Sequence, residues 1–183
     1  MYIELSQYYY DKCAEFADRQ LETSKDCYRR RGERRIDVIR HNLITGKLGE
    51  IAAYKYMVNH GYKVSKPDFT IYERRNKSFD ADLSTDCGIN VHVKSQGYDS
   101  LMRYGASWLL QKSDKLVKTG GEKEFILMVS MKGLQADVLG VVSVDDLHEH
   151  ELFEEPKVSR YAHTKKAIYF DSIKQSGISL EAI

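Results

Sequence analysis

Two short alternating stretches within residues 79–96, FDADLSTDCGINVHVKSQ, constrain the fold of this chain more than any other feature. In the first, apolar residues alternate with Asp80 and Asp82, so both carboxylates are expected on one face of a strand. After a polar turn, apolar residues alternate with polar residues that include His92 and Lys94. A hairpin of the two stretches therefore predicts Asp82, His92 and Lys94 on one face.

A carboxylate, an imidazole and an ammonium gathered in this way suit metal-assisted phosphodiester chemistry. The same alternation is also typical of a hairpin whose polar face simply meets water. From these residues alone the water-facing hairpin is the commoner arrangement, so the chemical interpretation depends on what the rest of the chain supplies.

The clearest predicted helix is residues 44–60, in which the apolar residues follow helical spacing and Gly61 supplies the end. Glu50 lies in its middle among small and apolar neighbours, so it is either exposed on a rim or held inward for a purpose. Gly46 and Gly49 cost helix stability. Their presence predicts that backbone or a ligand approaches this turn closely.

Periodicity and turn residues predict the remaining elements. Helices are expected at residues 3–25, 36–43 and 106–118, with Gly32 as a break after the first. Strands are expected at residues 62–72, 79–83, 89–95, 125–131, 138–144 and 167–170, and an acidic helical turn is expected from Asp145. The order indicates an α/β fold with one sheet and helices packed on it.

Length and composition limit the class of protein. With 183 residues, 42% apolar content and two prolines, the chain is expected to form one domain with a sizeable core. Its apolar runs are far too short to span a bilayer, and its polar N-terminus is unlike a signal peptide, so a cytoplasmic protein is expected. Cys13, Cys27 and Cys87 lack CxxC spacing and predict neither a disulfide framework nor a zinc site.

The net charge of +1 conceals separate basic and acidic regions. Two basic clusters precede the aspartate strand, and acids gather after residue 144. The basic residues are Arg29, Arg30, Arg31, Arg34, Arg35 and Arg40, followed by Arg74, Arg75 and Lys77. Such clusters would bind a phosphate backbone, although a solvated helix face with local ion pairs is as good an account of each cluster alone.

In order and spacing these segments resemble the core of the PD-(D/E)XK nuclease superfamily, which includes type II restriction enzymes, Holliday-junction resolvases and phage endonucleases. GKLGEIAAYKYMVNHGYKV is similar to the first helix of that core, with Glu50 at its acidic position. FDADL is similar to the strand that carries the metal-binding aspartate, which places Asp82 or Asp80 there. VHVKSQ is similar to the strand that normally contains acid-x-Lys, which places Lys94 at the lysine.

The resemblance covers residues 44–144. It implies a restriction-endonuclease-like α/β fold, with a central mixed β-sheet flanked by helices, in a single domain. Residues 1–43 are then an N-terminal helical extension, and residues 145–183 are a C-terminal segment. An intracellular location is expected, and phage encoding is compatible with the resemblance.

His92 departs from the motif, because it stands where the family has an acid. Mg²⁺ prefers oxygen ligands, whereas imidazole suits Mn²⁺ and later metals better. Three accounts stay open: His92 is a metal ligand, it is a base for the attacking water, or the site has lost catalysis and kept DNA binding. A working nuclease is favoured, since Glu50, Asp82 and Lys94 all remain.

Two residues are second-tier candidates. Asp68 follows Pro67 and matches the literal PD pair, but it lies on the preceding predicted strand. Gln96 lies one step beyond Lys94 on the same face, where it would contact water or phosphate or simply end the strand at the surface.

The implied activity is metal-dependent hydrolysis of DNA phosphodiester bonds, leaving a 5′-phosphate and a 3′-hydroxyl. Asp82 and Glu50, with His92 or Asp80, would hold Mg²⁺ or Mn²⁺. Lys94 would orient the attacking water or stabilise the transition state.

Double-stranded DNA is the expected partner, and the arginine clusters are expected to contact its backbone. Residues 97–107 are expected to form a loop in which Arg103 makes a further contact with a base or a phosphate. Cutting both strands usually needs two sites, so a homodimer is expected, with the tyrosine-rich first helix as a candidate interface. Two alternatives are a non-catalytic DNA-binding or assembly protein on the same fold, and an RNA-directed nuclease. Metal-independent DNA binding would favour the first alternative, and a preference for RNA would favour the second.

Overall fold

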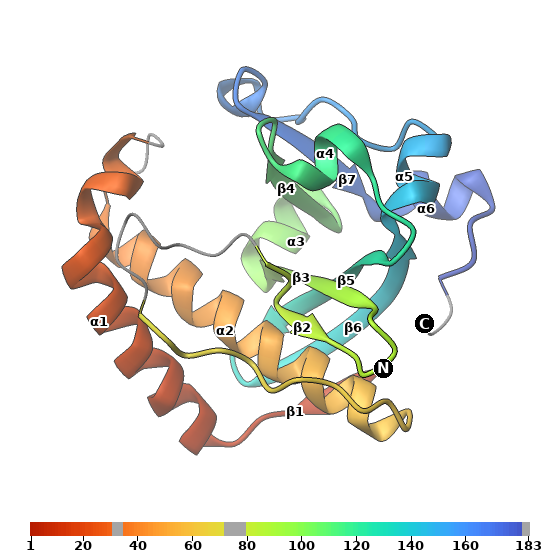
Figure 1. Cartoon of the computed structure of the whole chain (residues 1–183). Coiled ribbons are helices and arrows are strands. Elements are labelled where there is room, and N and C mark those ends of the chain that lie inside the picture. Colours follow the sequence, from red (N-terminus) through yellow and green to blue (C-terminus); the bar gives the residue numbers. More distant parts are fainter. Residues whose placement is uncertain (31–34, 72–79, 181–183) are drawn as a thin grey trace.

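The computed structural model describes residues 1–30, 35–71 and 80–180, and for residues 24–30 it describes only the backbone. The chain is mixed α/β (Figure 1). One long helix packs on one face of a five-stranded mixed sheet and a second long helix packs against the first, while a two-stranded sheet with short helices covers the other face.

The main sheet has the strand order β1-β6-β5-β3-β2, and β4 and β7 form the second sheet. The strands are β1 (Tyr2–Glu4), β2 (Leu83–Ser84), β3 (Asn90–Gly97), β4 (Ser107–Gln111), β5 (Glu124–Lys132), β6 (Gln135–Ser143) and β7 (Lys165–Tyr169). Within the main sheet β3 and β5 are parallel, and the other neighbouring strands are antiparallel. A parallel pair needs a crossover connection, which is provided by the segment that contains β4.

The helices differ sharply in length. They are α1 (Gln7–Arg30), α2 (Ile36–Asn59), α3 (Tyr98–Tyr104), α4 (Lys115–Thr119), α5 (Val144–Glu149) and α6 (Phe170–Ser176), with a 3₁₀ turn at Ser159–Tyr161. Two short helices have side-chain caps that satisfy their first backbone N–H groups. Asp114 accepts a hydrogen bond from the backbone of Leu116, and Ser143 accepts from those of Asp145 and Asp146.

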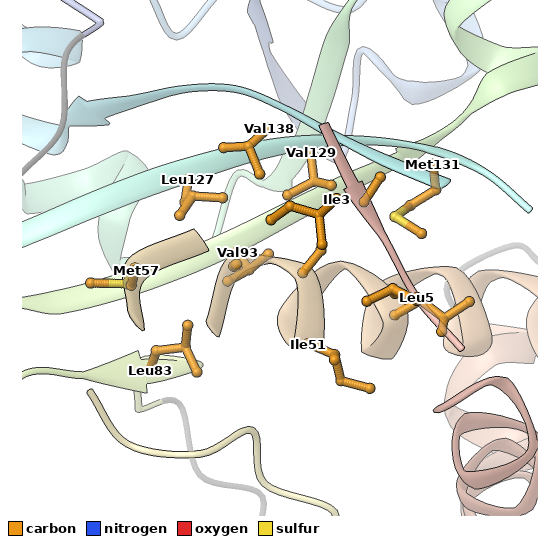
Figure 2. Close-up of a cluster of buried hydrophobic side chains, with 14 of the residues drawn as sticks. Ile3, Leu5, Ile51, Met57, Leu83, Val93, Leu127, Val129, Met131 and Val138 are labelled. Carbon is orange, nitrogen blue, oxygen red and sulfur yellow. The ribbon is translucent and has the colours of Figure 1, made fainter. Parts of the chain in front are cut away.

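The central strands are apolar on both faces. On the face covered by α2, Val93 and Val129 lie in an apolar cluster with Ile3 (Figure 2). On the opposite face, Ile126 packs with Trp108 in a second apolar cluster. Because successive strand residues point to opposite faces, β3 turns Val91, Val93 and Ser95 toward α2, and it turns His92, Lys94 and Gln96 the other way.

The predicted helix at residues 106–118 is wrong. The structure has strand β4 followed by the short helix α4. Trp108 and Leu110 are buried while Leu109 between them is exposed, which is the alternation of a strand. β4 forms its hydrogen bonds with β7, far along the chain, so no local pattern could reveal the pairing.

The predicted strand at residues 62–72 is also wrong over its described part, where Val64 forms only an isolated bridge with Thr85. The predicted aspartate strand is shorter than expected. β2 comprises Leu83 and Ser84, so Asp80 and Asp82 precede it, and Phe79 lies outside the described residues. The hairpin itself is present, since β2 pairs with β3 in antiparallel orientation.

Three further boundaries differ from the predictions. The predicted helices at 36–43 and 44–60 form one continuous helix, α2. The suspected loop at 97–107 contains helix α3. The first predicted helix is preceded by β1, which pairs with β6 at the edge of the main sheet.

The first 43 residues thus share the main core, since Ile3, Leu5 and Cys13 pack in the cluster under α2. Strands β5 and β6, helix α5 and strand β7 lie where the sequence predicts them, within a few residues. No helix in the described part of the chain has the length and apolar content needed to cross a bilayer.

Candidate catalytic site

Helix α2 crosses β3 at Gly49, and the crossing is close because glycine has no Cβ. A Cβ at Gly49 would overlap Oγ of Ser95. A close approach does occur at Gly49, but the approaching group is a side chain of the sheet, whereas the prediction named backbone or a ligand. A Cβ at Gly46 would have no heavy atom within 4 Å, so close approach does not explain that glycine.

Glu50 follows this crossing and is held inward, with only 12% of its side chain exposed. Burial raises the pKa of Glu50 to about 7. The Lys47 ammonium opposes this rise through its charge and its hydrogen bond, the negative charge of Asp82 adds to it, and the charge of Lys94 opposes it. Glu50 is thus a buried carboxyl group within electrostatic reach of both Asp82 and Lys94.

Asp82 lies directly before β2, against the edge of β3. Its Oδ2 accepts a hydrogen bond of 2.8 Å from the backbone N–H of Val93. The carboxylate takes the place of a strand partner at this point, because β2 begins only at Leu83. Asp82 is thereby fixed beside the residue that precedes Lys94.

Charge effects thus link Glu50 with Asp82 and Lys94, which belong to three separate segments of the chain, although Lys94 is on the face of β3 turned away from α2. Sequence reasoning missed Lys47, whose Nζ donates a hydrogen bond of 2.6 Å to Oε2 of Glu50. The spacing of three residues on a predicted helix could have indicated this pair.

His92 makes a different contact from the one that the sequence suggests. Its Nε2 lies 2.7 Å from Oε2 of Glu124, the first residue of β5, and the imidazole is nearly buried. Asn90 donates a hydrogen bond of 3.1 Å to the other oxygen of Glu124. Burial raises the pKa of Glu124, but the hydrogen bonds from His92 and Asn90 outweigh it and hold the pKa below its ordinary value.

Glu124 was not predicted, because its contact with His92 depends on the parallel pairing of β3 with β5. No local pattern in the sequence indicates that pairing. A carboxylate bound to one nitrogen of an imidazole orients the ring, whether the other nitrogen then serves a metal or a proton.

The contacts of the second-tier residues differ from those that the sequence suggests. Gln96 is buried. Its Nε2 donates a hydrogen bond of 3.0 Å to the backbone oxygen of Gly105, and its Oε1 accepts one of 3.0 Å from the backbone N–H of Ser107. It thus holds together the two ends of the segment that contains α3. Asp68 is exposed, and its backbone oxygen accepts a hydrogen bond of 2.7 Å from Lys47. Asp80 is exposed.

Two of the predicted DNA-binding arginines, Arg35 and Arg103, have described side chains, and both contact neighbouring side chains. Arg35 pairs with Asp37 at 2.6 Å on the surface. The guanidinium of Arg103 lies 5.3 Å from the ring centre of Tyr104 on α3. Arg31, Arg34, Arg74 and Arg75 lie outside the described residues, as do the side chains of Arg29 and Arg30. DNA contact by these clusters stays a prediction.

The two carboxylates suit one kind of metal better than another. Among the described residues, no three His, Cys, Asp or Glu side chains converge as metal ligands. A closed structural site needs about four protein ligands, whereas Mg²⁺ is commonly held by one or two carboxylates together with waters and substrate phosphates. Carboxylates are ligands that Mg²⁺ and Mn²⁺ accept, so Glu50 and Asp82 are the residues that would hold such a metal, together with water and substrate phosphate.

Comparisons of the chain with protein-family models, with curated proteins and with solved structures gave no match. The chemical interpretation of this site therefore depends on the geometry of Glu50, Asp82 and Lys94 and on the motifs that they occupy.

Proposed function

We propose that the chain is a divalent-metal-dependent endonuclease that hydrolyses DNA phosphodiester bonds on a restriction-endonuclease-like core. The observation that carries the proposal is a buried Glu50, with a pKa of about 7, within electrostatic reach of Lys94 and of an Asp82 that is bonded to the backbone of β3. A strongly perturbed carboxyl group with specific charged neighbours is typical of functional sites. These three residues also occupy the motif positions of the PD-(D/E)XK resemblance.

Each residue has a chemical role in this proposal. Glu50 and Asp82 would hold Mg²⁺ or Mn²⁺, with Oδ1 as the candidate ligand of Asp82 because Oδ2 is bonded to the backbone of Val93. A bound divalent metal lowers the pKa of water and offsets charge on the phosphate. Lys94 orients the attacking water or stabilises the negative charge of the pentavalent transition state.

The expected products are a 5′-phosphate and a 3′-hydroxyl. Double-stranded DNA is the proposed substrate, and the basic clusters before β2 are the proposed backbone contacts. A homodimer would supply the two sites needed for both strands. Tyr8 of α1 is 68% exposed and is a candidate member of its interface.

A non-catalytic DNA-binding protein is the second candidate. It is favoured by the pairing of Lys47 with Glu50, which neutralises the carboxylate without a metal. It is also favoured by His92 at the position where an acid would supply a metal ligand.

Cleavage of supercoiled plasmid in EDTA, Mg²⁺ or Mn²⁺ tests the proposal, with the wild type beside Lys94→Ala. Metal-dependent nicking or linearisation is expected, with a loss of at least about 10²-fold in Lys94→Ala. Lys174→Ala on α6 is the matched control and should cleave like the wild type. An RNA substrate of equal length tests the RNA-directed alternative.

If the wild type cleaves DNA with neither metal and Lys94→Ala still binds DNA, the nuclease proposal is wrong and a DNA-binding protein is supported. Cleavage that persists in Lys94→Ala would move the active site elsewhere in the chain.

A further inference from the structure

The ammonium group of Lys47 is enclosed at the candidate site. Its Nζ lies 2.6 Å from Oε2 of Glu50 and 2.7 Å from the backbone oxygen of Asp68. The ring centres of Phe16 and Phe69 lie 5.0 Å and 5.6 Å from it. Only 15% of the Lys47 side chain is exposed. A largely desolvated cation thus lies on the same carboxylate that the proposed function assigns to a metal.

We propose that Lys47 is the resident cation of this site, and that it must leave Glu50 before a divalent metal can bind that carboxylate. The inference rests on the proposed function, because it concerns the use of the same Glu50. Two cations at contact distance from one carboxylate repel each other, and away from bulk water this repulsion is several times stronger than in it. Lys47 and the metal therefore compete.

The other partners of Lys47 allow this exchange without rebuilding the helix. The carbonyl of Asp68 and the rings of Phe16 and Phe69 are neutral groups that attract an ammonium. They can keep Lys47 nearby after Glu50 has turned to a metal. The displaced ammonium then stays within the site as a second positive charge.

The competing explanation is that Lys47 only ties residues 62–71 to α2 through Asp68. Metal affinity separates the two explanations, because a purely structural lysine does not compete for Glu50. Its removal would leave metal binding unchanged or weaken it by loosening the site.

The first test measures Mn²⁺ affinity without DNA, from the electron paramagnetic resonance signal of unbound Mn²⁺, at several pH values up to about 8.5, because loss of the Lys47 charge also raises the pKa of Glu50. Lys47→Met is expected to bind Mn²⁺ at least about tenfold more tightly than the wild type. Lys12→Met is the matched control, since Nζ of Lys12 lies 4.2 Å from the ring centre of Phe69 in the same region. Lys12→Met should bind Mn²⁺ as the wild type does.

The second test uses the wild-type protein, so it stands even if Lys47→Met does not fold. Reductive methylation of lysines is followed by mass spectrometry with and without Mg²⁺, and Lys12 is the internal reference. Mg²⁺ should accelerate methylation of Lys47 relative to Lys12, because the ammonium leaves its ion pair. An unchanged ratio would show that Lys47 does not move.

Failure of this inference differs from failure of the proposed function. If the wild type cleaves DNA with metal but Lys47→Met has the affinity of the wild type or a weaker one, Lys47 is structural and the nuclease stands. If neither protein binds Mn²⁺ and the wild type does not cleave DNA, both proposals are overturned.

Discussion

At Glu50, burial and local charge oppose each other within one side chain. Taking a carboxylate out of water favours its neutral form, while the adjacent ammonium of Lys47 favours the charged form. Burial has the larger effect, so the group titrates at about 7, close to neutral pH. A carboxyl group in this range can exchange a proton for another cation at little cost, as the proposed function would require of Glu50.

The first prediction concerns the pH dependence of stability. In the folded protein Glu50 has a pKa of about 7, against an ordinary value of 4.5, so it binds its proton more tightly than in the unfolded chain. The resulting stabilisation is fully present below pH 4.5 and is lost as the pH rises through 7. The free energy of unfolding of the wild type should therefore fall by about 3 kcal/mol, relative to that of Glu50→Gln, as the pH rises from 4.5 through 7.

Urea unfolding of both proteins at a series of pH values measures this difference. Asp82→Asn provides a control, because the Asp82 charge raises the pKa of Glu50 and its removal should move the window to lower pH. A free-energy difference that stays constant with pH would contradict the account of Glu50.

The second prediction concerns the identity of the metal. His92→Glu should raise cleavage with Mg²⁺ relative to Mn²⁺ by roughly tenfold, since a carboxylate replaces an imidazole. Glu124→Gln should accompany the substitution, because the new carboxylate would otherwise lie beside that of Glu124. Initial rates in each metal give the ratio. Full activity and an unchanged ratio in His92→Ala would remove His92 from the metal ligands.

Sequence patterns indicated the candidate side chains that stand out against their local sequence. Glu50 stood out because it interrupts an apolar helix beside two glycines, and Asp82 and Lys94 stood out in short alternating stretches. Glu124 gave no such indication, since it is an ordinary charged residue at the start of a strand. Its contact with His92 is set by the pairing of two strands, which is a property of the sheet.

At the scale of elements, the contact between α2 and β3 positions the site. Ser95 Oγ is buried at this contact without a hydrogen-bond partner among the described residues, which marks how tightly the helix lies on the strand. Because Gly49 has no side chain, α2 can approach β3 closely, and Glu50 follows directly after the point of contact. The same closeness leaves little room for any added atom.

The third prediction tests that crossing. Gly49→Ala should destabilise the protein by about 1–3 kcal/mol, because the new methyl group would overlap the side chain of Ser95. Gly46→Ala is the matched control and should stabilise it by about 0.5–1 kcal/mol, since alanine favours helix and nothing lies within 4 Å. Thermal unfolding measures both. Ser95→Gly should restore part of the stability that Gly49→Ala loses. If Gly49→Ala and Gly46→Ala stabilised the protein equally, the close contact at Gly49 would be contradicted.

The elements that sequence patterns predicted correctly are those with strong internal periodicity or continuous apolar runs. Helix α2 and strands β5 and β6 are of this kind. β4 was mistaken for helix because Trp108, Leu109 and Leu110 are all apolar, so no polar residue at position 109 marks the alternation. Its strand form is selected by pairing with β7.

At the scale of the whole molecule, the N-terminal residues and the candidate site share one core. β1 closes the edge of the main sheet beside β6, and α1 lies along α2 (Figure 1). Arg40 of α2 makes two hydrogen bonds to Asp18 of α1, at 2.6 Å and 2.9 Å. The helix that carries Glu50 is thus supported by the sheet on one side and by α1 on another.

The last prediction tests whether residues 1–43 belong to the same cooperative unit as the site. Ile3 is 7% exposed and packs in the main cluster, so Ile3→Ala should destabilise the whole protein by about 2–4 kcal/mol. Tyr2→Thr is the matched control on the same strand, where Tyr2 is 58% exposed, and it should change stability by less than about 0.5 kcal/mol.

Urea unfolding followed by far-ultraviolet circular dichroism and by Trp108 fluorescence measures the effect. Trp108 lies in the second apolar cluster, on the other side of the main sheet from Ile3. The urea midpoints of both transitions should fall by the same amount in Ile3→Ala, because all elements joined by the sheet are expected to unfold as one cooperative unit. If the fluorescence transition kept its wild-type midpoint while the circular dichroism transition moved, the N-terminal segment would be a separate folding unit. Glu50 would then be supported by α2 and β3 without β1.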